Sequence, residues 1–61
     1  MTLDEQEQVN FAAEVMAYDE ARSLGVTHPT VWAKENAADF LVAAYEFMKP
    51  RFERNVHPKS G

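Results

Sequence analysis

Glu53 and His57 are the pair of side chains in this 61-residue chain whose types and spacing best suit metal binding. They lie four positions apart, so a helix would place both on one face, and carboxylate and imidazole groups both bind divalent metals. Metal sites in helix bundles combine inward-facing Glu residues with Glu-x-x-His pairs, and the sequence contains no such pair. We therefore interpret Glu53 and His57 as a surface ion pair and expect no metal site.

The other histidine, His28, lies in a segment that resembles a helix start more than a catalytic site. Thr27 or His28 can cap a helix, and Pro29 fits its first turn. No Ser, Thr or Cys nucleophile stands in an evident partnership with His28. The chain has no cysteine and only two glycines, which excludes disulfides, cysteinyl zinc sites and glycine-rich phosphate loops. We expect no catalytic residue and no cofactor, and an enzyme is the least favoured class of function.

The C-terminal segment is basic and could contact nucleic acid. Basic side chains bind phosphates, and an aromatic ring can stack on a base. The candidate residues are Lys49, Arg51, Phe52, Arg54 and Lys59. Residues 1–46, however, carry a net charge of −7 against +3 for residues 47–61, whereas a dedicated nucleic-acid binder has a basic face. Nucleic-acid binding is therefore the alternative function, and docking of this tail onto acidic helices competes with it.

Two helices have to position these groups, and the first has clear end signals. Thr2 followed by Glu5 predicts a capping box, in which each residue satisfies a backbone N–H near the other. Gly25 is the residue type that ends helices in the left-handed conformation. These signals predict a helix over residues 3–24 and a turn over residues 25–29.

The second helix is predicted over residues 30–48. Pro29 fits its first turn, where a missing N–H costs nothing. Pro50 cannot continue it without a kink. A connection of this length joins the helices of an antiparallel helical hairpin, so the predicted fold class is all-α.

The residues after the second helix form a short tail. Residues 51–57 can form a third short helix, with Phe52 and Val56 four positions apart on one face. We therefore divide the chain into an acidic helical hairpin over residues 1–49 and a partly ordered basic tail over residues 50–61.

Both predicted helices carry more apolar surface than a hairpin can cover. The first helix has one stripe at Phe11, Val15 and Tyr18, and a second stripe, more than about 100° away, at Val9, Ala12, Ala13 and Met16. The second helix has a broad stripe at Ala33, Ala37, Phe40, Leu41, Ala44, Phe47 and Met48, extended by Val31, Ala38, Val42 and Tyr45. Because a hairpin covers about one stripe per helix, the excess predicts a further contact.

Three arrangements would cover this excess. Phe52 and Val56 could fold back over it, a different protein could bind it, or a second copy could complete a four-helix bundle. We favour the homodimer, because small residues allow helices to approach closely. The predicted self-association surface consists of Val9, Ala13, Met16, Ala38 and Val42.

Trp32 lies off the main apolar stripe, near Asn36 and Asp39 on a helical projection. It either packs over the turn against Leu24 or Val26, or it anchors a partner, since Trp is enriched at binding hot spots. The predicted function is that of a small acidic interaction protein, such as a regulator, inhibitor or assembly factor, including those that phages encode. The predicted partner-binding residues are Trp32, Tyr18 and Tyr45 as apolar anchors, with Glu35, Asp39 and Glu46 as the charged rim.

The sequence also bears on location. No apolar run approaches the roughly 18–20 residues of a membrane span, and the acidic start of the chain is unlike a targeting segment. The absence of cysteine fits a reducing compartment. We expect a cytoplasmic protein without a membrane partner.

Overall fold

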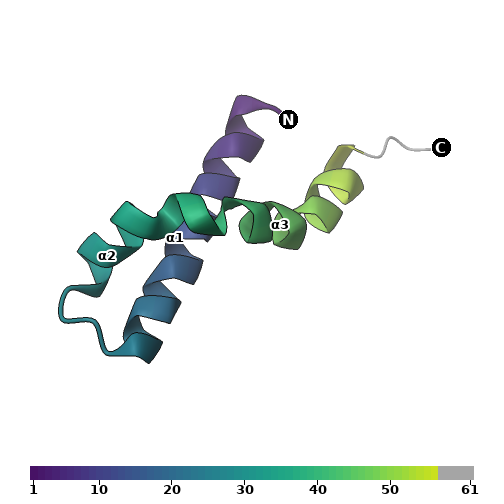
Figure 1. The fold of residues 1–61 in the computed structure, drawn as a ribbon. Coiled ribbons are helices and arrows are strands. Elements are labelled where there is room, and N and C mark those ends of the chain that lie inside the picture. Colours follow the sequence, from purple (N-terminus) through teal and green to yellow (C-terminus); the bar gives the residue numbers. More distant parts are fainter. Residues whose placement is uncertain (57–61) are drawn as a thin grey trace.

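The chain folds as a helical hairpin with one straight arm and one interrupted arm (Figure 1). The computed structural model describes the backbone of residues 1–56 and the side chains of residues 1–53. Its elements are α1 (Leu3–Leu24), α2 (Pro29–Asn36), the 3₁₀ helix η1 (Ala37–Phe40) and α3 (Leu41–Val56). Among the described residues the regular structure is entirely helical, which confirms the all-α class and the hairpin.

The ends of α1 lie where the sequence predicts them. The Thr2 hydroxyl accepts a hydrogen bond from the Glu5 N–H at 3.1 Å, and the Glu5 carboxylate accepts one from the Thr2 N–H at 2.9 Å. At the other end Gly25 adopts a φ of 76°, and the N–H of Val26 donates to the carbonyl of Ala21 at 3.0 Å. Both ends of α1 are thus fixed by local hydrogen bonds.

Substitution of Gly25 by Ala should lower the free energy of unfolding by about 1 kcal/mol. No atom lies within 4 Å of the position that a Cβ would occupy, so the cost comes from the left-handed backbone alone. Chemical denaturation at one fixed protein concentration measures it, with Ser23→Ala on the exposed last turn of α1 as the control. Equal stability of the two variants would contradict the role assigned to this turn.

The second arm is interrupted, so the prediction of one helix over residues 30–48 is wrong in its interior. The side-chain amide of Asn36 donates to the carbonyl of Trp32 at 2.9 Å, and Asn36 has a φ of −110° and a ψ of 2°. An Asn side chain that bonds to the backbone in this way competes with the helical hydrogen bonds of its own turn. The chain therefore leaves α2 at Asn36 and continues as η1.

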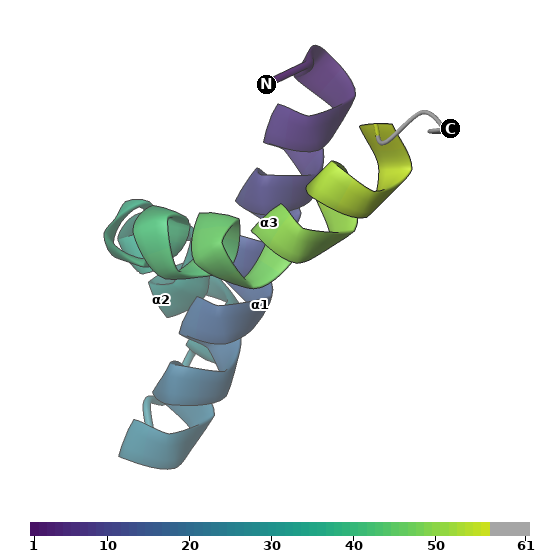
Figure 2. The same ribbon diagram turned by 90° about the vertical axis from the view of Figure 1, so that its right-hand side faces the viewer.

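The predicted end of the second helix before Pro50 is also wrong. Pro50 lies inside α3, which continues to Val56 as one helix in place of a separate short one. Proline lacks the N–H that would bond to the Glu46 carbonyl, but both residues are exposed, so water can satisfy that carbonyl. The boundary predicted between residues 49 and 50 therefore falls within α3. Figures 1 and 2 show the last part of α3 turning toward the N-terminal end of α1.

The core lies where the second arm crosses α1 (Figure 2) and consists mostly of alanine. Its buried side chains are Val9, Ala13, Ala17, Ala21, Ala33, Ala44 and Phe52. The first four recur every four residues and form one ridge of α1, and small side chains along such a ridge let a second helix approach closely. Phe52 is the largest of the buried residues and packs in one cluster with Val9, Ala13 and Ala44.

The two apolar stripes of α1 face in opposite directions. Val9 and Ala13 face the core, with Ala12 and Met16 packed against it, so the chain covers this stripe itself through Phe52. Phe11 and Val15 face outward, and Phe11 is 70% exposed.

The molecule is long and thin, measuring 50 × 19 × 13 Å. Its radius of gyration is 13.8 Å, against about 10 Å for a compact domain of this length. None of the described helices is long and apolar enough to cross a bilayer. With a core on one side of each arm only, the opposite sides remain open to other molecules.

Candidate interaction surfaces

The three predicted aromatic anchors lie in three separate places. The Trp32 ring is half-buried and meets the Phe40 ring edge-on, with centroids 6.4 Å apart. Tyr18 is half-buried on α1, with the guanidinium of Arg22 5.8 Å from its ring centroid. Tyr45 is half-buried and packs against the core. The three aromatic residues therefore do not form one patch.

Trp32 has an aromatic neighbour that the sequence did not indicate, Phe40. Of the two neighbours predicted at the turn, Leu24 is mostly exposed and Val26 is half-buried. Phe40 ends η1, so its position depends on the interruption of the second arm. Apolar periodicity alone does not reveal that interruption, because a single turn of 3₁₀ helix hardly alters it.

The predicted charged rim lies along the outer face of the second arm. We use the name outer face for exposed residues on the side away from the core: Val31, Glu35, Ala38, Asp39, Val42 and Glu46. Val42 is 76% exposed. The outer face thus combines three carboxylates with two exposed valines.

The predicted self-association residues are divided between core and surface. Val9 and Ala13 are buried in the chain's own core, and Met16 packs against it. Ala38 and Val42 are exposed and belong to the outer face. The residues on α1 are therefore unavailable to a second copy while the hairpin is closed.

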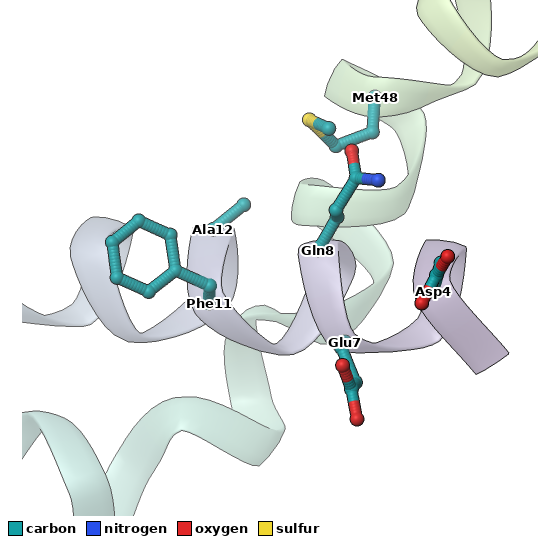
Figure 3. Close-up of a pocket in the computed structure, with 6 residues that line it drawn as sticks. All are labelled: Asp4, Glu7, Gln8, Phe11, Ala12 and Met48. Carbon is teal, nitrogen blue, oxygen red and sulfur yellow. The ribbon is translucent and has the colours of Figure 1, made fainter.

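Phe11 lies between two hollows on the surface of α1. The sequence indicates the apolar stripe of Phe11, Val15 and Tyr18 but not these hollows. The larger hollow, of about 420 Å³, is lined by Asp4, Glu7, Gln8, Phe11, Ala12 and Met48 (Figure 3). The smaller, of about 190 Å³, is lined by Phe11, Glu14, Val15, Tyr18, Thr30, Ala33 and Lys34. Figure 3 shows Gln8, Ala12 and Met48 directed toward one space, with Phe11 at its edge. Phe11 thus projects from α1 with open space on either side.

Phe52 cannot serve the predicted nucleic-acid site. It is 7% exposed and packs within the core, so its ring is not free to stack on a base. Lys49 and Arg51 are exposed, and the Arg51 guanidinium lies 5.5 Å from the ring centroid of Phe47. The Arg54 side chain and Lys59 lie outside the described residues.

The groups considered for chemistry are spread along the chain. His28 precedes α2 and is exposed, and its side chain makes no capping hydrogen bond, while Pro29 occupies the first turn as expected. Within the described part of the chain, no three His, Cys, Asp or Glu residues lie close enough to hold a metal ion. His57, the predicted neighbour of Glu53, lies outside that part.

Comparisons with protein families, with characterised proteins and with solved structures found no match to this chain. Any inference about function must therefore come from the surfaces of the chain itself.

Proposed function

We propose that this protein is a small acidic interaction protein, which binds a basic surface of another protein and acts as a homodimer of two hairpins in a four-helix arrangement. The observation that carries this proposal is the distribution of apolar side chains between core and surface. Five of the seven buried residues are alanines, whereas Phe11, Val42 and Phe47 are 70%, 76% and 57% exposed. Each of these exposed side chains would gain free energy by burial against another macromolecule.

Energetics support a protein partner. Burial of one Phe or Val side chain contributes about 1.5–3 kcal/mol, and a whole small domain has a stability of only about 5–15 kcal/mol. Covering two or three of the exposed side chains would therefore change the stability of this thin hairpin substantially.

We assign the outer face to the partner that is a different protein, and not to the second copy of this chain. Glu35, Asp39 and Glu46 give it negative charge, and Val31 and Val42 give it an apolar centre. Complementary charge speeds the encounter of two proteins and disfavours partners of the wrong sign. A basic patch with a shallow apolar centre fits this face.

The alternative of nucleic-acid binding has less support. Among the residues with described side chains, Lys49 and Arg51 are exposed and could contact phosphate. The Phe52 ring is buried, so it cannot stack on a base. We therefore keep protein binding as the proposed function.

A charge-reversal experiment tests the assignment of the outer face. The tagged protein is used to capture proteins from a lysate of its source cells, and the captured proteins are quantified. The double variant E35K/E46K should lose its specific partner by about tenfold or more, because like charges across an interface cost several kcal/mol. The control E20K/E53K changes the net charge equally at exposed positions off this face.

A protein that is captured by wild type and control, but not by E35K/E46K, supports the proposal. The same captured proteins at the same amounts with all three baits would overturn it.

A further inference from the structure

We infer that the exposed face of α1 is a self-pairing surface, on which α1 of a second copy lies antiparallel, with Asp4 of each chain against Arg22 of the other. This inference rests on the homodimer in the proposed function and assigns its interface. We call this face the α1 seam and define it by six residues: Asp4, Gln8, Phe11, Val15, Tyr18 and Arg22.

The spacing of the α1 seam is that of a coiled-coil seam. Its residues follow one another at intervals of 4, 3, 4, 3 and 4 positions, as the a and d positions of a heptad do. Such positions keep one line along a helix, so the seam extends for about 27 Å at 1.5 Å per residue. It lies opposite the ridge of Val9, Ala13, Ala17 and Ala21 that faces the core.

The α1 seam is open in the hairpin. Asp4, Gln8 and Arg22 are exposed, Phe11 is mostly exposed, and Tyr18 is half-buried. The second arm flanks the seam: Met48 of α3 lines one hollow beside Phe11, and Thr30, Ala33 and Lys34 of α2 line the other. These hollows leave room for side chains of a second helix.

Two copies of the α1 seam that run in opposite directions place complementary residues against each other. When two copies of α1 run antiparallel about the level of Ala13, Asp4 meets Arg22, Gln8 meets Tyr18, and Phe11 meets Val15. A two-fold axis makes each of these pairs occur twice. The pairing thus has an apolar centre, polar pairs beside it and an ion pair at each end.

The two possible directions of pairing differ in charge. In a parallel pair, Asp4 would face Asp4 and Arg22 would face Arg22, which places like charges at both ends. In the antiparallel pair, opposite charges meet at both ends. The guanidinium of Arg22 already lies 5.8 Å from the Tyr18 ring centroid, so it is directed along the seam. The Asp4–Arg22 pairs therefore favour an antiparallel second copy over a parallel one as the occupant, around the apolar centre of Phe11 and Val15.

Sedimentation equilibrium of the full chain over a range of concentrations tests this inference. The wild type should dimerise, and Asp4→Arg and Arg22→Asp should each raise the dimer dissociation constant by about tenfold or more, because each places like charges at both ends. The double variant D4R/R22D restores opposite charges in the antiparallel pair, so its dissociation constant should return close to that of wild type. Phe11→Glu should also weaken the dimer by at least about tenfold.

Helical content from circular dichroism shows that each variant folds; all three positions are exposed, so we expect it to be unchanged. Recovery in the double variant supports the antiparallel register, since no effect on folding of a single site would reverse in this way. A wild type that stays monomeric to millimolar concentration overturns the inference. A wild-type dimer whose dissociation constant is the same in D4R and in R22D also overturns the inference, because the homodimer interface would then lie elsewhere.

Failure of this inference is distinguishable from failure of the proposed function. The capture experiment uses Glu35 and Glu46 on the second arm, and none of the α1 seam. A monomer that still captures its partner through the outer face would overturn the seam and retain the interaction protein.

Discussion

Replacing Phe52 by Ala should lower the free energy of unfolding by about 3–5 kcal/mol, the usual cost of truncating a buried Phe. Phe52 is the largest side chain in its core cluster, and its neighbours Val9, Ala13 and Ala44 are too small to fill the space it would leave. In a domain this short, such a loss leaves little net stability. Urea denaturation followed by circular dichroism, at one fixed protein concentration, measures the change.

Phe47→Ala is the matched control for Phe52→Ala. It removes the same side chain from the same helix at a position that is 57% exposed. We expect a much smaller loss, because little apolar area leaves contact with the protein. If the two variants were equally stable, α3 would not fold back onto α1, and the residues after Pro50 would behave as a separate tail.

The parts of the fold that the sequence predicts correctly are those set by local interactions. Thr2, Glu5 and Gly25 define both ends of α1 through hydrogen bonds within a few residues. The turn before Pro29 is predictable for the same reason, since it also depends on residues that are close together in the sequence. The break in the second arm is also local, since it depends on one Asn36 side chain. However, a short 3₁₀ helix hardly changes the spacing of apolar residues, so the apolar periodicity does not reveal this break.

The orientation of α1 could not be predicted in this way. Its outer stripe has the larger side chains, Phe11 and Val15, and transfer energies alone would bury it. The structure instead buries the smaller stripe, because alanines let the second arm approach closely and Phe52 then covers Val9. This choice depends on the path of α3 beyond Pro50, which is a tertiary property. The same reversal exposes the α1 seam and removes Val9 and Ala13 from the predicted dimer surface.

Ala13→Leu separates these two assignments of α1, and we expect it to lower the free energy of unfolding by about 1–3 kcal/mol. Ala13 is fully buried in the cluster with Ala44 and Phe52, so a larger side chain must push the second arm away from α1. If Ala13 lay on a self-association surface, the added apolar area would strengthen the dimer instead. Denaturation at matched concentrations, together with sedimentation equilibrium, measures both effects.

Ala43→Leu is the control, because Ala43 is exposed on α3 and an exposed substitution of this kind usually changes stability by less than about 0.5 kcal/mol. Loss of stability in A13L but not in A43L would locate the close approach of the two arms at Ala13. A more stable A13L with a tighter dimer would mean that the Ala13 stripe, and not the α1 seam, meets the second copy. Since the two stripes lie on opposite sides of one helix, a closed hairpin can offer only the outer one to a partner.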